Sequence, residues 1–314
     1  MSDSVSLRLQ AASGDPIAQL RLAQMMLIGR ETKYAPEEGI KLVQQACARQ
    51  LPDALLFHAT LAALGYARPR SFGDAVKYVA QAAALGDARA KGQLQALGGV
   101  EGFDTNHWFG PAQMVQHASA PRVFTVDNFL PRAACEWLIK PASRKLSSAL
   151  INDAKTGKQA PDAGRSNSVA GSNFLEPDLV LQLANLRIAG AIKLPLANQE
   201  PTNILHYARG QEYTLHYDFI TPDEEYGFAA ELKQMGQRIA TVLVYLNDNY
   251  EGGETDFPRI GFRFKGRPGD ALIFWNLSEQ GKREPLALHA GLPVTKGEKW
   301  LFSKWIREKA VPLL

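Results

Sequence analysis

The sequence predicts a two-part protein of α and β structure, with an α-helical repeat solenoid followed by a strand-rich domain. Two observations predict it. Small residues recur every 36 positions through the first hundred residues, a period typical of stacked helix pairs. After residue 200 the pattern changes to short runs of β-branched and aromatic residues between glycine-rich turns, which indicates strands. The predicted boundaries are 1–98 for the repeats, 99–120 for a linker and 121–314 for the second domain.

Alanines and glycines define the helical repeat. They keep the interval of 36 at Ala12, Ala48 and Ala84, at Ala18, Ala54 and Ala90, and at Gly29 and Gly65. Alanines at helical spacing let helices approach closely, and glycines end them. The motif Ala-x-x-Gly-Asp-x-x-Ala at Ala11–Ala18 resembles the Sel-one-like repeats, which are relatives of the tetratricopeptide repeats. The second copy departs from it, with Gln50-Leu51 in place of Gly-Asp.

Two interpretations of the repeats remain open. Stacked repeats form a concave surface that can bind a protein partner, or these helices only cover the second domain. So few repeats are barely enough for stability alone, which favours packing against the second domain.

Composition and charge exclude several classes of protein. The net charge of +3 over 314 residues indicates neither a nucleic-acid partner nor a membrane surface. No apolar run approaches the length of a membrane span, and the first residues lack the pattern of a signal peptide. Cys47 and Cys135 lie in different segments, which predicts free thiols and a reducing, cytoplasmic location, and a cysteine-based metal site is not expected.

His216 and Asp218 form a candidate metal site. Residues i and i+2 of a strand face the same side, so both side chains can reach one ion. His289, far along the chain, can complete a set of two histidines and one carboxylate, which leaves three positions of Fe(II) open. His-x-Asp also occurs as an ordinary surface pair, so the motif has to be read with its surroundings.

Many separate motifs surround these residues in a particular order. They are Tyr207, Gly210, Gln211, Tyr213, Thr241, Tyr245-Leu246, Gly252-Gly253-Glu254-Thr255, Phe257-Pro258, Gly269-Asp270, Gly291, Pro293-Val294, Gly297, Lys299-Trp300 and Lys304-Trp305. Over roughly residues 121–308 the chain resembles the prolyl 4-hydroxylase-type Fe(II)/2-oxoglutarate dioxygenases. The resemblance implies a double-stranded β-helix, a jelly roll of two facing sheets.

The resemblance also implies how iron and 2-oxoglutarate would be held. His216, Asp218 and His289 would bind Fe(II), and 2-oxoglutarate would chelate it through its 1-carboxylate and 2-keto oxygens. Lys299 would bind the distal carboxylate. Most lysines are exposed, but Lys299 lies between Gly297 and an apolar run, which argues against a surface position. Arg263 and Lys265 are the alternative cations.

Four further residues match family positions. Tyr207 and Thr255 match hydroxyl donors to the same distal carboxylate, although both residue types are also common in ordinary strands. Tyr213 and Arg238 match positions that face the substrate. Each of the four is therefore a candidate binding residue.

The resemblance implies an oxidoreductase that couples the decarboxylation of 2-oxoglutarate to succinate and CO2 with hydroxylation of an unactivated C–H bond. Fe(II), 2-oxoglutarate and O2 would be required, with ascorbate as a further cofactor. A peptidyl proline of an intracellular protein is the expected substrate, docked on the repeats. The alternatives are another side chain or a small molecule as substrate, or a repeat-based binding module with a degenerate barrel. Asp218 argues against an iron halogenase, which needs that position vacant.

The remaining segments predict a few elements. Val123–Val126 indicates a strand, and Pro131–Leu138 and Leu175–Ile192 indicate helices. Asn152–Asn173 and Phe219–Gln237 read as two loops beside the active site. Such loops either close over a substrate or are merely flexible.

Overall fold

The computed structural model describes residues 3–148, 150–152, 159–161, 164–222 and 225–312. Contacts divide the chain into two compact units. The first takes its residues from Met1–Phe109, Phe174–Arg187 and Pro312–Leu314, and the second from Gly110–Asn173 and Ile188–Val311. Residues 174–187, which the sequence alone assigns to the second domain, are thus grouped with the helices. Each unit is described by itself.

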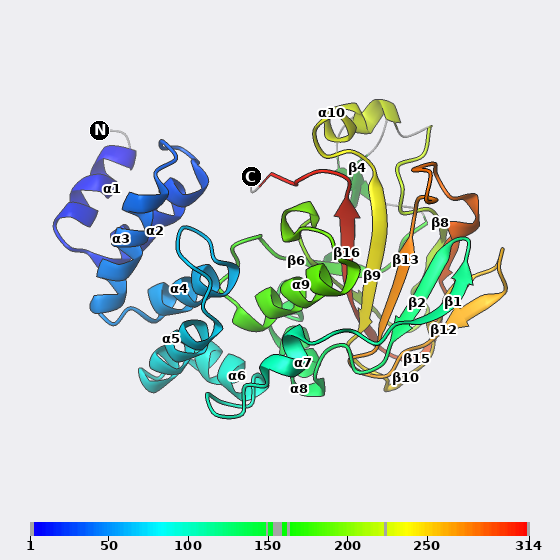
Figure 1. Ribbon diagram of the computed structural model, residues 1–314, viewed down its shortest axis with the longest axis horizontal. Helices are drawn as coiled ribbons and strands as arrows, with labels where there is room; N and C mark the ends of the chain where they lie inside the picture. The colour runs from blue at the N-terminus through cyan, green and yellow to red at the C-terminus, as the bar shows by residue number, and fades with distance from the viewer. Residues whose placement is uncertain (1–2, 149, 153–158, 162–163, 223–224, 313–314) are drawn as a thin grey trace. The chain divides into compact units, whose positions relative to one another are not determined.

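The first unit consists of consecutive helices, coloured blue to cyan in Figure 1. They are α1 (Asp3–Ala12), α2 (Pro16–Ile28), α3 (Pro36–Ala48), α4 (Pro52–Leu64), α5 (Phe72–Ala84), α6 (Ala88–Ala96) and α7 (Thr105–Phe109). The period of 36 is confirmed, because α1, α3 and α5 end at the repeating alanines. Gly29 and Gly65 terminate α2 and α4 in the left-handed conformation, with φ of +74° and +67°.

The departure from the motif in the second repeat has a local cost. Asp15 and Asp87 cap α2 and α6 by accepting a backbone N–H bond of 2.7 and 2.8 Å, which is a typical N-cap. Leu51 at the equivalent position makes no side-chain cap. Gln50 holds φ at +56°, where Gly14 has +91°, and a left-handed non-glycine residue costs about 1–2 kcal/mol. The same turn is therefore built in this repeat with some strain.

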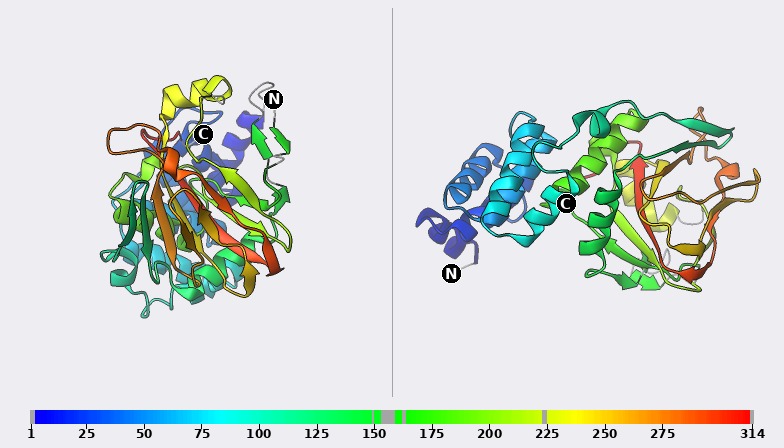
Figure 2. Two further views of the ribbon diagram at one scale, coloured as in Figure 1. Left: turned by 90° about the vertical axis from the view of Figure 1, so that its right-hand side faces the viewer. Right: turned by 90° about the horizontal axis from the view of Figure 1, so that it is seen from below.

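The second unit is a jelly roll of antiparallel sheets, as predicted (Figures 1 and 2). The large sheet has the order β1 (Val115–Ser119), β2 (Arg122–Val126), β13 (Ala271–Trp275), β9 (Arg238–Tyr245), β16 (Lys299–Arg307), β7 (Asn203–Tyr207), β6 (Ser168–Gly171) and β3 (Ser147–Ser148). The small sheet has the order β12 (Phe262–Phe264), β11 (Thr255–Phe257), β14 (His289–Gly291) and β8 (Tyr213–His216). Two strand pairs complete it, β10 (Tyr250–Gly252) with β15 (Val294–Gly297), and β4 (Leu150–Asn152) with β5 (Gln159–Pro161).

The core of this unit lies between the sheets. Alternate residues of the large sheet, such as Leu243, Tyr245 and Phe274, pack with Phe257 of the small sheet. Strand residues two apart share a face, so one face of β9, β13 and β16 lines the interior. Helix α8 (Arg132–Ala142) packs against β7.

Several segments differ from the sequence-based expectation. The stretch read as a linker contains α7 and β1, and β1 extends the large sheet by pairing with β2. The prediction of a loop over Phe219–Gln237 is wrong for the middle of that range, where α10 (Glu225–Met235) forms. The predicted loop Asn152–Asn173 includes β5 and β6; its residues 153–158 and 162–163 lie outside the described part.

The other predicted elements are present with shifted ends. The strand at Val123–Val126 is β2, the first helix is α8, and the second is α9 (Leu179–Ile192). Short 3-10 turns occur at Leu196–Asn198 and Pro285–Ala287. Within the described ranges, no helix combines the length and the apolar character that crossing a membrane requires.

Candidate active site

Two strands of the small sheet bring the predicted metal ligands together. His216 ends β8 and His289 begins β14, and the two residues are directly paired in the antiparallel register. Asp218 lies in the bend that follows β8, and its carboxylate is directed at the two imidazoles. Ligand atoms of the three residues all lie within 4.8 Å of one another. They form a metal-ligand cluster in the part of the chain that the structure describes.

Both imidazoles present the same nitrogen to the cluster. Nδ1 of His216 lies 2.8 Å from the carbonyl oxygen of Thr214, and Nδ1 of His289 lies 3.0 Å from that of Ala287. A carbonyl only accepts hydrogen bonds, so each Nδ1 carries the proton and each Nε2 keeps its lone pair. Burial lowers the pKa of His216 to about 3, so its ring is neutral and able to ligate at neutral pH.

Asp218 supplies the anionic oxygens. Its Oδ1 lies 3.6 Å from Nε2 of His216, and its Oδ2 lies 3.6 Å from Nε2 of His289. Burial opposes ionisation of Asp218, but the charge that the two histidines carry when protonated and a 2.6 Å hydrogen bond from the Thr241 hydroxyl hold the pKa of Asp218 below its ordinary value. Two neutral nitrogens and one carboxylate are a donor set that suits Fe(II).

Lys299 lines the same pocket. Its side chain is 1% exposed, and its Nζ donates a 2.7 Å hydrogen bond to the carbonyl of Gly253. No carboxylate of the described residues lies within 4 Å of this ammonium. Burial lowers the pKa of Lys299 to about 7. A buried cation without an anionic partner is unfavourable, so the pocket is suited to an anionic ligand.

Tyr207 and Thr255 bring hydroxyl groups into the pocket that Lys299 lines. The ring of Tyr207 has its centroid 5.2 Å from Nζ of Lys299, and burial raises the pKa of Tyr207 to about 12, so its hydroxyl stays a donor. Oγ1 of Thr255 lies 2.8 Å from the hydroxyl of Tyr245. Both predicted hydroxyl residues therefore line the pocket with Lys299, and Tyr245 orients one of them.

Tyr213 and Arg238 have different surroundings. Tyr213 lines the pocket, and its ring stacks on His216 with centroids 3.5 Å apart. Arg238 lies outside the pocket lining, because its guanidinium bonds Glu200 at 2.7 Å and covers the ring of Trp305 at 3.7 Å. Its contact with the ring of Trp305, which lines the pocket, places it next to the site.

The alternative cations do not enter the pocket. Arg263 is exposed and pairs with Asp256 at 2.9 Å. Lys265 donates to the carbonyl of Tyr250 at 2.6 Å. Among the three candidates, Lys299 is the one that lines the pocket.

Sequence reasoning assigned no role to four residues of this region. Trp305 and Arg165 line the pocket, while Thr241 and Asn276 form a hydrogen-bonded chain to Asp218. Trp305 is six residues after Lys299 on β16, so the strand period could have placed it on the same face. Arg165 comes from a polar stretch without periodicity, and no sequence signal marks it.

A jelly roll with these residues in one interior pocket defines the class of Fe(II)/2-oxoglutarate oxygenases. A model of the 2OG-Fe(II) oxygenase superfamily matches residues 202–307. Probable prolyl 4-hydroxylase 3 of Arabidopsis thaliana is 35% identical over 207 residues, which cover 59% of this chain and 69% of that protein. The chain belongs to the 2OG-Fe(II) oxygenase superfamily, in its prolyl 4-hydroxylase group.

Solved structures match each part of the chain. The viral collagen prolyl hydroxylase of Paramecium Bursaria Chlorella virus-1, in complex with 2OG, is 28% identical and covers 60% of this chain and 96% of its own, with a TM-score of 0.46. A Sel1 repeat protein from Oxalobacter formigenes is 27% identical and covers 28% of this chain and 67% of its own, with a TM-score of 0.27.

Proposed function

We propose that this chain hydroxylates a peptidyl proline, with Fe(II) held by His216, Asp218 and His289 and 2-oxoglutarate held at Lys299. One observation carries the proposal. The same pocket contains a cluster of three metal ligands and a buried lysine that lacks an anionic partner among the described residues. A dicarboxylate that chelates the metal at one end and pairs with the lysine at the other satisfies both.

Each side chain has a separate task in this scheme. The Nε2 atoms of His216 and His289 and one oxygen of Asp218 would hold the metal, and three protein ligands would leave its remaining positions to 2-oxoglutarate and O2. The ammonium of Lys299 pairs with the distal carboxylate, and the hydroxyl of Tyr207 donates to it. When bound, Fe(II), 2-oxoglutarate and O2 supply the oxidation that replaces C–H by C–OH and yields succinate and CO2.

Proline in a peptide is the substrate that the surroundings favour. Relatives at 34–35% identity carry the name prolyl 4-hydroxylase. The rings of Tyr213 and Trp305 line the pocket, and aromatic walls suit an apolar ring. The Nε1–H of Trp305 is buried without a hydrogen-bond partner among the described residues, so it is a donor for a peptide carbonyl. Another side chain or a small molecule is the alternative.

The test is hydroxylation by the full chain with Fe(II), 2-oxoglutarate and ascorbate. We expect a proline-containing peptide to gain about 16 Da, one oxygen atom, and amino-acid analysis to find hydroxyproline. The same peptide with alanine for proline is the control and should gain nothing. Product from a free amino acid, with none from any peptide, would contradict the peptidyl substrate.

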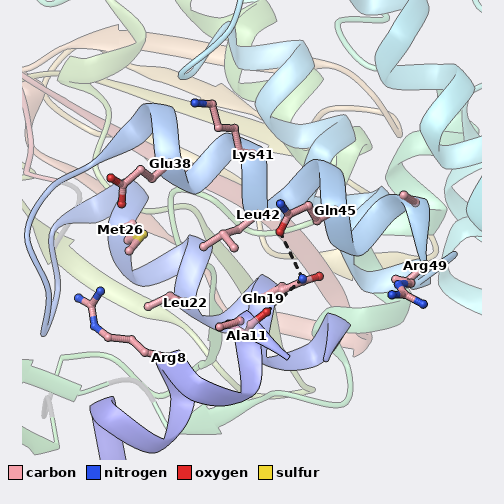
Figure 3. A pocket seen from close by; sticks show the side chains of 12 residues that line it. Arg8, Ala11, Gln19, Leu22, Met26, Glu38, Lys41, Leu42, Gln45 and Arg49 are labelled. Carbon is pink, nitrogen blue, oxygen red and sulfur yellow. Dashed lines mark hydrogen bonds between the residues drawn. The ribbon is translucent and has the colours of Figure 1, made fainter. Parts of the chain in front are cut away.

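A groove on the helical repeats supports a protein as the substrate (Figure 3). Helices α1, α2 and α3 form it, with Leu22, Met26 and Leu42 contributing apolar surface. Gln19 is 5% exposed, and its Nε2 donates to the carbonyl of Ala11 and to Oε1 of Gln45, both at 3.2 Å. These bonds join the three helices, so the groove is a formed feature of the unit.

The charges of this groove favour an acidic occupant. Three basic side chains, Arg8, Lys41 and Arg49, line it together with one carboxylate, Glu38. None of the four has an ion-pair partner within 4 Å in the described structure, and Arg8 bonds only the hydroxyl of Thr32. Unpaired cations around an apolar surface complement an acidic segment with apolar residues. The groove is therefore proposed to dock such a segment of the protein substrate.

This docking predicts a charge-dependent KM. In the wild type, an acidic, leucine-containing extension on a proline peptide should lower KM about tenfold, which corresponds to about 1.4 kcal/mol. The double variant Lys41→Glu, Arg49→Glu should lose that advantage but keep its KM for the short peptide. Lys77→Glu, an exposed residue of α5 outside the groove, is the matched control. An extension without effect on the wild type would contradict docking here.

A further inference from the structure

Three buried side chains form a chain of hydrogen bonds that ends on a metal ligand. Nδ2 of Asn276 lies 3.0 Å from Oγ1 of Thr241, which lies 2.6 Å from Oδ2 of Asp218. Their exposed fractions are 0%, 1% and 5%. Thr241 belongs to β9 of the large sheet and Asp218 follows β8 of the small sheet, so the chain of bonds crosses the interior between the sheets.

The direction of these bonds follows from the donors available. The Thr241 hydroxyl has one proton. The Asn276 amide donates to its oxygen, which leaves that proton to point at the carboxylate of Asp218. The opposite amide orientation would place an oxygen against the hydroxyl, and the single proton could then serve only one of two acceptors. Asn276 therefore determines where the Thr241 hydroxyl points.

We propose that Thr241 and Asn276 are positioning residues for the metal site, with Asn276 acting through Thr241. The hydroxyl engages Oδ2 of Asp218, which would leave Oδ1 to a bound metal and favour binding through one oxygen. A carboxylate that bound through both would occupy a position needed for 2-oxoglutarate or O2. This inference rests on the proposed iron site and names the contacts that orient one of its ligands.

The oxygen of the same amide supports this role. Oδ1 of Asn276 is buried and has no hydrogen-bond partner among the described residues. A buried polar atom left unpaired destabilises a fold, whereas an apolar side chain of similar shape avoids that cost. The backbone of Asn276 is already held, because its N–H donates to the carbonyl of Ile239 and its carbonyl accepts from Glu284. The contribution that remains for the Asn276 side chain is the hydrogen bond from its NH2 group to the Thr241 hydroxyl.

The experiment is a calorimetric titration of Co2+ into the metal-free full chain, which needs no turnover. We expect Thr241→Val to weaken Co2+ binding about 10- to 100-fold, as loss of such outer contacts typically does, and Thr241→Ser to retain it. Asn276→Leu should also weaken binding while leaving the thermal midpoint unchanged or higher. The double variant should be no weaker than Thr241→Val alone, because the effects of residues acting through one another do not add.

A buried threonine elsewhere in the large sheet is the matched control. Thr125 of β2 bonds His117 at 2.8 Å and does not line the pocket, so Thr125→Val should bind Co2+ like the wild type. Unchanged Co2+ affinity in Thr241→Val would overturn the proposal. If Asn276→Leu does not fold, the result with Thr241→Val still decides it. Additive losses in the double variant would overturn the action through Thr241. Failure of the wild type itself to bind Co2+ would instead refute the metal site.

Discussion

Replacing His289 by alanine should abolish 2-oxoglutarate turnover, and His216→Ala or Asp218→Ala should do the same. Each change removes one of three ligands, and two side chains hold the metal too weakly to orient it. Turnover is measured as succinate formed by the full chain with Fe(II). Zn2+ should bind the wild-type site and yield no product, because zinc has no redox chemistry.

The control for this loss is a histidine outside the pocket. His206 lies on β7, bonds Glu298 at 3.1 Å and does not line the site, so His206→Ala should keep its turnover. The circular dichroism of all variants should match the wild type. Succinate formation by a variant that lacks both His216 and His289 would show that these residues do not hold the iron.

Removing the charge of Lys299 is expected to raise the KM for 2-oxoglutarate. Loss of a buried charge partner costs about 2–5 kcal/mol, so Lys299→Met should raise KM by about 30- to 4,000-fold. The ligand-free chain should be at least as stable as the wild type, since an unpaired buried ammonium is replaced by an apolar side chain of similar length. Arg263→Met, at an exposed residue that does not line the pocket, is the control and should leave the KM unchanged.

The pKa of Lys299 also predicts how this KM depends on pH. The pKa of about 7 means that the ligand-free lysine is charged below pH 7 and neutral above it. A carboxylate binds the charged form, so above pH 7 binding requires uptake of a proton. KM should therefore rise with pH above about 7, by up to about tenfold per unit. Lys299→Arg, which is charged at all these pH values, should lose this dependence. An equally steep rise in the arginine variant would assign the titration to another group.

Two of the three proposed metal ligands were predictable because their pattern is local, whereas His289 was predicted from the family resemblance. His216 and Asp218 are two residues apart, which is the strand spacing that marked them, although Asp218 lies in the bend after β8; Lys299 follows a turn glycine at the start of an apolar strand. Asn276 offered no such signal, because its role depends on the Thr241 hydroxyl that the fold brings within 3.0 Å. Arg165 reaches the pocket from a polar stretch whose composition resembles any loop.

The fold was predictable to a similar degree. The 36-residue interval indicates where most of these helices begin and end, since it places a capping aspartate before α2 and α6 and a glycine after α2 and α4. Helix α10 was missed because its polar residues and Gly227, in its first turn, conceal the helical period. The grouping of residues 174–187 with the helices was also missed. It depends on distant contacts, such as the 2.7 Å bond from the Leu179 N–H to Gln93.

The two histidines are each oriented by the chain just before them, since the carbonyl that fixes each ring belongs to the residue two positions earlier. The orientation of each imidazole thus depends on a contact within two residues along the chain. What the folded chain adds is the alignment of β8 with β14, which sets His216 opposite His289. A slip of one residue in that alignment would send one imidazole to the other face of the sheet. The three ligands therefore come together only when β8 and β14 pair in this register.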